Sequence, residues 1–199
     1  MKKSLNQQIL EYASREAEGV PLTSKALLHL GTRAAVDQAL WRLAASNRLL
    51  RVGRGLYVRV EKTRFGSRPP STESVVRGIE ERQGETVVPH GAAEANSLGL
   101  TSQVPVREIF LTSGRTRNLN LAGREVELRH APAWQLVLAH RVAGAAVRAL
   151  SWAGPERARD VVTVLKSRLS PVDVRELLAA RSRLPTWMAR EVSALTSHA

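Results

Sequence analysis

Hydrophobic positions at the start of the chain repeat at helical spacing. Apolar side chains recur every three or four positions between residues 5 and 16, and Ser4 with Gln7 has the pattern of a capping box. The two signals together predict a first helix over residues 5–16. A second, shorter helix is expected between Thr23, which would cap it, and Gly31, which would end it.

The third predicted helix carries a complete apolar stripe. Thr32 is expected to cap this helix, which would continue to about Ser46. Apolar residues fall at positions i, i+3, i+4 and i+7, the spacing of one buried helix face. They are Val36, Ala39, Leu40 and Leu43.

The spacing of apolar residues then changes to every second position, which predicts two strands. The residues expected on their buried faces are Leu50 and Val52 in the first strand and Leu56, Val58 and Val60 in the second. Gly53-Arg54-Gly55 would close the hairpin, because glycine adopts the positive φ that tight turns need. Three helices followed by a β-hairpin are the element order of a winged helix-turn-helix.

The rest of the chain predicts a second, mixed domain. Its expected elements are helices over 72–82 and 91–98, strands over 87–88, 108–112 and 125–129, and about four helices from Trp134 onward, the first with a stripe reaching Ala145. A Gly/Ser/Pro stretch over residues 65–71 separates the two patterns and is expected to be a linker. The predicted fold class is therefore α+β: a winged helix-turn-helix over residues 1–64, then an α/β domain over 72–199 with a small sheet and a C-terminal helical part.

Composition narrows the classes of function. The 199 residues include 30 Lys and Arg against 18 Asp and Glu, a net charge of +12, and no cysteine. The missing cysteines exclude disulfide scaffolds, Cys-ligated zinc or iron–sulfur sites and thiol nucleophiles. No apolar run is long enough for a membrane span and the N-terminus turns polar within a few residues, so we expect a cytoplasmic protein. Residues 1–64 hold 12 basic against 5 acidic residues, which makes nucleic acid the first partner to consider.

The third helix offers side chains suited to reading DNA bases. With Val36 at the centre of the buried face, the opposite face holds Ala34, Gln38, Trp41, Arg42 and Ala45. Gln pairs with adenine, Arg with guanine, and a small Ala admits a thymine methyl group. Arg33, at the helix start, suits a phosphate. The alternatives are a merely solvated face and, for Trp41, packing under the hairpin or against the second domain.

The hairpin offers side chains suited to phosphates. Its basic residues are Arg48, Arg51, Arg54 at the tip and Arg59, followed by Lys62 and Arg64, and Tyr57 would share a face with Arg59. A wing of this kind lies along the DNA backbone or the minor groove, although a solubilising strand edge has a similar composition. The predicted DNA-binding residues are Arg33, Ala34, Gln38, Trp41, Arg42, Arg48, Arg51, Arg54, Tyr57 and Arg59.

Signals of catalysis are weak. The five histidines show no metalloprotease spacing, no nucleophile-elbow or phosphate-loop motif is present, and the neighbouring Glu80 and Glu81 point to different helix faces. We therefore expect no catalytic residue, cofactor or metal. Two other classes stay open at this point: a protein-interaction module built on the winged helix, and an enzyme that uses the basic domain to hold nucleic acid.

Several segments resemble a known family. Leu30–Leu40 with Arg51–Tyr57 resembles the N-terminal winged helix of AbiEi-like antitoxins, which belong to type IV (abortive-infection) toxin–antitoxin systems. His90–Pro105 resembles the segment after the first strand of that family's C-terminal domain, and the strand Ile109–Thr112 also fits. The similarity extends over about residues 5–195 and is weakest in the last helices.

This resemblance implies a bacterial phage-defence antitoxin that represses transcription of its own operon. The winged helix would bind double-stranded DNA at its own promoter, at inverted repeats. The toxin would be a nucleotidyltransferase-like protein, neutralised by the second domain without a stable complex. The alternative is a winged-helix protein-interaction module or a DNA-binding regulator unrelated to toxin–antitoxin systems.

Overall fold

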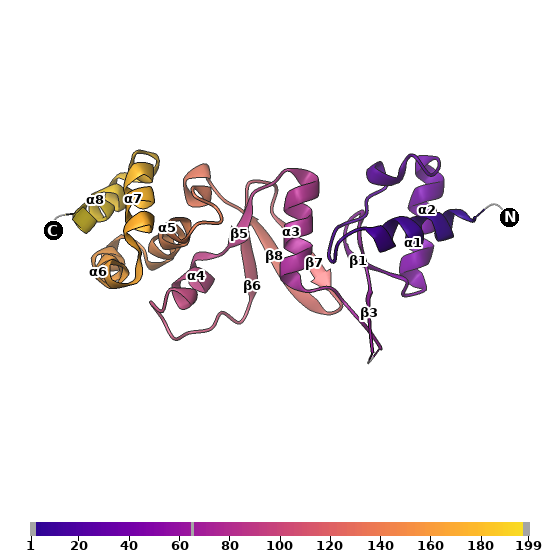
Figure 1. Ribbon diagram of the computed structural model, residues 1–199, viewed down its shortest axis with the longest axis horizontal. Helices are drawn as coiled ribbons and strands as arrows, with labels where there is room; N and C mark the ends of the chain where they lie inside the picture. The colour runs from indigo at the N-terminus through magenta and orange to yellow at the C-terminus, as the bar shows by residue number, and fades with distance from the viewer. Residues whose placement is uncertain (1–2, 65, 197–199) are drawn as a thin grey trace. The chain divides into compact units, whose positions relative to one another are not determined.

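The structure is a computed structural model that describes residues 3–64 and 66–196 (Figure 1). The fold is α+β with small sheets. The chain forms two compact units, one made of Met1–Glu85 with Asn118–Val126 and the other of Thr86–Arg117 with Glu127–Ala199.

Two α-helices and a hairpin build the core of the first unit. Its elements up to Glu85 are α1 (Leu5–Arg15), the 3₁₀ turn η1 (Lys25–Leu27), α2 (Arg33–Ala45), β1 (Leu49–Gly53), β2 (Leu56–Arg59), β3 (Glu61–Thr63), β4 (Gly66–Arg68) and α3 (Thr72–Gln83). The capping box of the first helix is confirmed, since Ser4 and Gln7 each accept a hydrogen bond from the other's backbone N–H, at 3.3 and 2.9 Å. Ile9 of α1 packs in one apolar cluster with the stripe of α2.

The expected second helix is wrong: only the 3₁₀ turn η1 forms there. Its N-cap residue is Ser24 and not the predicted Thr23, although the hydroxyl of Thr23 accepts a hydrogen bond from the N–H of Ala26 at 3.2 Å. The backbone hydrogen bonds of Ala26, Leu27 and Leu30, however, each reach back three residues, as in a 3₁₀ helix, instead of four. Between Pro21 and Gly31 the segment keeps this tighter 3₁₀ bonding and does not pass into a regular α-helix.

The expected faces of the hairpin are partly wrong because β1 contains a bulge. The pairing of β1 with β2 shifts between Arg51 and Gly53, so Leu49 and Val52 are buried while Leu50 is half-buried. In β2, Leu56, Tyr57 and Val58 are all buried; Val60, predicted for this strand, lies just after it and is half-buried. Of the two turn glycines, only Gly55 adopts a positive φ, of +69°.

Residue 65 of the expected linker at 65–71 lies outside the described residues, and residues 66–71 lie inside the first unit. Strands β3 and β4 pair as an antiparallel hairpin. Arg68, at the end of β4, donates two hydrogen bonds to the carboxylate of Glu18, at 3.0 and 3.1 Å, and the N–H of Ser71 donates to Glu18 at 2.9 Å. Two carboxylate oxygens thus tie this stretch to the segment that follows α1.

Helix α3 continues the first unit by packing closely on the segment before η1. A Cβ atom added to Gly78 would lie 2.8 Å from the carbonyl oxygen of Gly19 and from the Cα of Val20. Arg82, in the last turn of α3, forms an ion pair with Glu16 at the end of α1. The first unit therefore includes α3 and extends to Glu85, beyond the predicted domain end at residue 64.

The second unit joins strands of a small sheet to a helical part. Its elements are β5 (Val87–Pro89), α4 (Gly91–Ser97), β6 (Glu108–Thr112), the end of β8 (Arg124–His130), the 3₁₀ segments η2 (Ala133–Leu136), η3 (Pro155–Arg157), η4 (Arg181–Arg183) and η5 (Ala194–Thr196), and the helices α5 (Val142–Ala153), α6 (Ala158–Arg168), α7 (Pro171–Ala180) and α8 (Thr186–Ser193). Four strands of the chain form one sheet in the order β5-β6-β8-β7, where β7 is Arg117–Leu121. Helices α5 to α8 share one apolar cluster that includes Val147, Leu150 and Leu165.

Close contact between α4 and α5 organises the start of the helical part. A Cβ atom on Gly91 would lie 2.2 Å from the carbonyl oxygen of Arg148, so only glycine permits this approach. Beside it, the buried Arg148 donates from Nε and Nη2 to one oxygen of Glu94, at 3.0 and 2.7 Å, and from Nη2 to the carbonyl of Ala139 at 2.9 Å. Separating α4 from α5 would break this pair and leave a buried charge without a partner, which is strongly unfavourable. The pair therefore holds the two helices in one arrangement.

Two expectations for the second part of the chain need correction. The strand β7 (Arg117–Leu121) was not anticipated, although Leu119 and Leu121 alternate with asparagines and the turn residues Ala122 and Gly123 both have positive φ. Residues 134–141 do not form an α-helix: the 3₁₀ segment η2 occupies their start, and Leu138 has a φ of +51°. That conformation stops a helix, so α5 begins only at Val142.

Replacing Gly78 by alanine should destabilise the first unit by about 1–3 kcal/mol, because the new methyl group meets backbone atoms that cannot move aside. Gly31→Ala is the matched control, since its Cβ would find only ordinary contacts at 3.7 Å and beyond. Denaturant unfolding of both full-length variants measures the difference. A Gly78→Ala protein as stable as the parent would contradict the packing of α3 described above.

Acidification should weaken the second unit through His90, whose Nδ1 caps α4 by accepting the N–H of Ala92 at 3.2 Å. Burial, and then the positive charge of Arg129, lower the pKa of His90 below its usual 6.5. The unfolded chain therefore binds more protons below about pH 6.5, so stability is full above that pH and falls as the pH decreases. Unfolding midpoints at pH 7.5 and 5.5 should differ more for the parent than for His90→Asn, which keeps a capping side chain. Equal pH dependence in the two proteins would refute the role of His90.

Candidate nucleic-acid interface

Helix α2 presents a polar and aromatic face opposite its buried stripe. Thr32 begins the helix by accepting the N–H of Ala35 on its hydroxyl, at 3.4 Å. The four stripe residues Val36, Ala39, Leu40 and Leu43 are all buried, as predicted. The residues predicted for the opposite face are all exposed: Ala34, Gln38, Trp41, Arg42 and Ala45.

The side chains on this face are available to a partner. Gln38 and Arg42 lie one turn apart, and neither makes a side-chain hydrogen bond or ion pair with another residue that the structure describes. Trp41 is 60% exposed, so it does not pack under the hairpin. An amide, an indole and a guanidinium thus lie together on one helix face.

Arg33 lies at the N-terminal end of α2. Its Nε is 3.6 Å from a carboxylate oxygen of Asp37, which also accepts a hydrogen bond from the hydroxyl of Ser24. The Arg33 side chain is 70% exposed, and an exposed pair of this kind contributes roughly 0–1 kcal/mol. Arg33 can therefore exchange its carboxylate partner for a phosphate at little cost.

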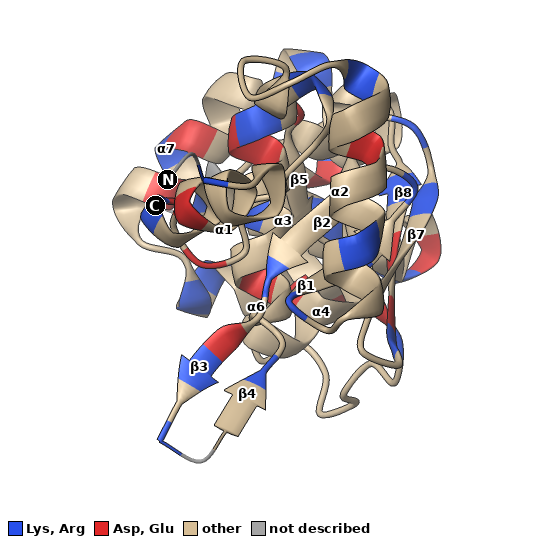
Figure 2. Cartoon of the chain, turned by 90° about the vertical axis from the view of Figure 1, so that its right-hand side faces the viewer, with Lys and Arg blue, Asp and Glu red and all other residues tan. Residues whose placement is uncertain are grey.

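The β1–β2 hairpin presents three of its predicted contact residues to solvent. Arg48, Arg51 and Arg54 are exposed, and none has a side-chain partner among the described residues. Figure 2 marks Lys and Arg on α2, on this hairpin and on the β3–β4 hairpin that follows it. Positive charge on the first unit is therefore carried by both the helix and the strands after it.

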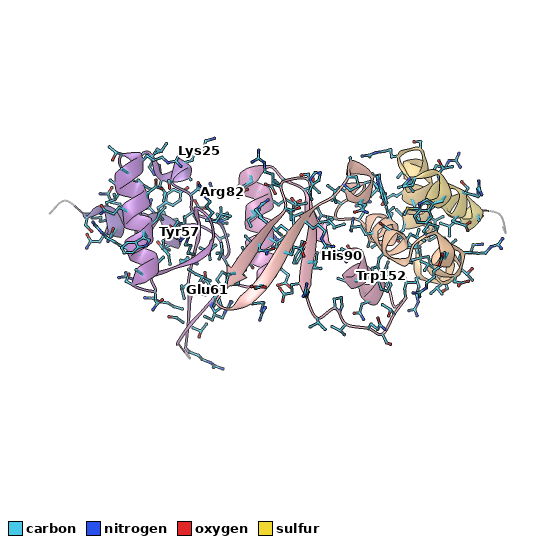
Figure 3. The ribbon with its side chains drawn as sticks, turned by 180° about the vertical axis from the view of Figure 1, so that it is seen from behind. Lys25, Tyr57, Glu61, Arg82, His90 and Trp152 are labelled. Atoms are coloured by element: carbon cyan, nitrogen blue, oxygen red, sulfur yellow. The ribbon has the colours of Figure 1, made fainter. Side chains whose placement is uncertain are left out.

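Two predicted contact residues are engaged elsewhere. Tyr57 is buried, 7% exposed, in the apolar cluster of the first unit, and its backbone pairs with Leu22 (Figure 3). Arg59 is half-buried; it donates from Nε and Nη2 to Glu61, at 3.2 and 3.3 Å, and from Nη1 to the carbonyl of Ser14 at 3.3 Å. Both were predicted to contact DNA, but each side chain is used within the first unit, Tyr57 in the core and Arg59 in hydrogen bonds to Glu61 and Ser14.

Sequence reasoning did not single out two basic residues that lie beside Arg33 and Arg54. Lys25 of η1 and Arg82 of α3 line the same surface pocket as these two arginines (Figure 3). Lys25 could have been recognised as a basic residue in the segment before the predicted reading helix. Arg82 carried no such signal, because its position depends on how α3 packs.

The described residues show neither a metal site nor a membrane-crossing helix. Within residues 3–64 and 66–196, no three His, Asp or Glu side chains gather in a group that could hold a metal ion. In the same ranges, none of the helices has the length and apolar character needed to cross a bilayer.

Comparison with known proteins identifies a family. A family model described as a family of unknown function, DUF6088, matches residues 8–170, and the chain belongs to this family. A search of curated proteins found no match to this chain. The crystal structure of the RV2827C protein from Mycobacterium tuberculosis is similar, with a TM-score of 0.52 and 17% sequence identity over 99% of this chain and 78% of that one. At this identity the likeness concerns the fold alone.

Proposed function

We propose that this protein binds DNA through a winged helix-turn-helix in its first unit and represses transcription of its own operon. The observation that carries this proposal is the exposed face of α2, where Gln38, Trp41 and Arg42 lie together opposite a fully buried stripe. In this assignment α2 is the reading helix, η1 takes the place of the helix before it, and the β1–β2 hairpin is the wing.

Base recognition would come from α2. Gln38 can bridge N6 and N7 of adenine, and Arg42 can donate two hydrogen bonds to O6 and N7 of guanine. Their spacing of one helical turn suits neighbouring base pairs in the major groove. Ala34 allows close approach, and the exposed indole of Trp41 offers an apolar surface to a thymine methyl group.

Phosphate contacts would come from the arginines around this face. Arg33 at the start of α2 and Arg48, Arg51 and Arg54 on the hairpin are exposed and positively charged. Such contacts hold the protein in register on the duplex without reading the sequence. Tyr57 and Arg59 take no part in this proposal because their side chains hold the hairpin on the core.

The biological role that we propose is that of an antitoxin in a type IV, abortive-infection toxin–antitoxin system. Support for it comes from the resemblance of Leu30–Leu40, Arg51–Tyr57 and His90–Pro105 to AbiEi-like antitoxins. The second unit would then counteract a nucleotidyltransferase-like toxin without forming a stable complex with it. No catalytic step of its own is assigned to the chain.

Alanine at Arg42 should reduce sequence discrimination. Losing a bidentate base contact costs roughly 1–3 kcal/mol, so the ratio of affinities for the promoter duplex and a random duplex should fall by about 5- to 150-fold. Arg181→Ala, which removes an exposed arginine of η4, is the matched control and should leave the ratio unchanged. Fluorescence anisotropy at two salt concentrations measures both affinities. If Arg42→Ala preserves the ratio, α2 does not read the bases.

Rescue of growth tests the antitoxin role separately. Cells that express the nucleotidyltransferase-like product of an adjacent reading frame should recover when the full-length chain is co-expressed. The Arg42→Ala variant should rescue equally well, because its loss concerns operator recognition in the first unit. Failure of the parent protein to rescue would contradict the antitoxin role and leave the DNA-binding proposal to its own test.

A further inference from the structure

A surface pocket of about 680 Å³ in the first unit has a strongly basic lining. Four separate elements contribute to it: η1 with the residues before it, the first turn of α2, the tip of the β1–β2 hairpin and the end of α3. Its charged lining residues are Lys25, Arg33, Arg54, Arg82 and Asp37. Four cations thus converge on a cavity that a single carboxylate borders.

The one carboxylate in the lining is already occupied. Asp37 accepts a hydrogen bond from the buried Ser24 and lies 3.6 Å from the Nε of Arg33. Arg82 is likewise paired, with Glu16 outside the pocket. Lys25 and Arg54 have no ion pair with any residue that the structure describes. Two positive charges therefore face the cavity without compensation from the protein.

The types of cation present favour a phosphate over other anions. Arginine presents a planar fork of N–H donors and lysine a compact point charge, and the two together are common partners of phosphate oxygens. A phosphate offers three or more acceptor oxygens and can meet Lys25, Arg33 and Arg54 at once, whereas a carboxylate has only two oxygens. Apolar atoms of Pro21, Ala26 and Leu56 also line the pocket and reduce the screening of these charges by water.

We propose that this pocket binds a phosphate group, held mainly by Lys25 and Arg54 and completed by Arg33. The group belongs either to the backbone of DNA or to a free phosphate compound such as a nucleotide. Only the first of these two sources rests on the DNA-binding function proposed above. In both cases α3 contributes Arg82 and Gln83 to the pocket, so the binding site extends beyond the helix and hairpin of the winged helix.

Titration of inorganic pyrophosphate into the full-length protein, followed by calorimetry at low salt, tests the site without DNA. The parent protein should bind, and the double variant Lys25→Ala/Arg54→Ala should bind at least tenfold more weakly. Lys166→Ala/Arg181→Ala is the matched control: it removes the same two charge types from exposed positions of α6 and η4. This control should retain the parent affinity, which separates a defined site from general attraction by net charge.

A second titration with a 20-base-pair duplex distinguishes the two sources. If the phosphate belongs to DNA, the double variant should lower the slope of log affinity against log salt by about two. If the ligand is a free phosphate compound, the duplex affinity should be unchanged while pyrophosphate binding is lost. The proposal is wrong if the parent does not bind pyrophosphate. It is also wrong if the Lys25→Ala/Arg54→Ala variant binds pyrophosphate as tightly as the parent or as tightly as the Lys166→Ala/Arg181→Ala control. A protein that binds pyrophosphate through this pocket but no duplex would contradict the proposed function and not the site.

Discussion

The buried stripe of α2 determines what the first unit can present to a partner. Val36 and Leu40 are fully buried and Ala39 and Leu43 nearly so, in one cluster with α1, β1 and Tyr57. Burying a large aliphatic side chain contributes about 1.5–3 kcal/mol. The rotation of α2 about its axis is therefore set by several kcal/mol, far more than the exposed polar residues contribute. Gln38, Trp41 and Arg42 face outward as a consequence.

Local signals predicted much of the fold. The caps at Ser4 and Thr32 and the apolar spacing that follows each of them predicted α1 and α2, and helices were also predicted where α3 and α4 form. Contacts between distant residues explain most of what was missed. The expected linker contains β4 because Arg68 reaches Glu18, and α3 joins the first unit because Gly78 packs on Gly19. By contrast, β7 has a local signal of its own in the alternation of Leu119 and Leu121 with asparagines.

In the candidate site, too, local geometry predicted some residues, whereas the positions of others depend on contacts between distant residues. Exposure of the α2 face followed from helical geometry alone, so all five residues predicted there lie where expected. The hairpin residues were harder to predict, because the bulge at β1 and the partners of Tyr57 and Arg59 depend on packing against α1 and the segment before η1. The basic pocket was beyond sequence reasoning, since its lining comes from four elements that only the folded unit brings together.

Photocrosslinking from α2 tests most directly whether its exposed face contacts DNA. The full-length protein would carry a benzophenone amino acid in place of Gln38 or, as a control, in place of the exposed Val164 of α6, and would be irradiated with its promoter duplex. If the exposed face of α2 contacts DNA, position 38 should give a covalent protein–DNA product and position 164 should give none. Binding of the duplex without a product from position 38 would contradict contact through α2.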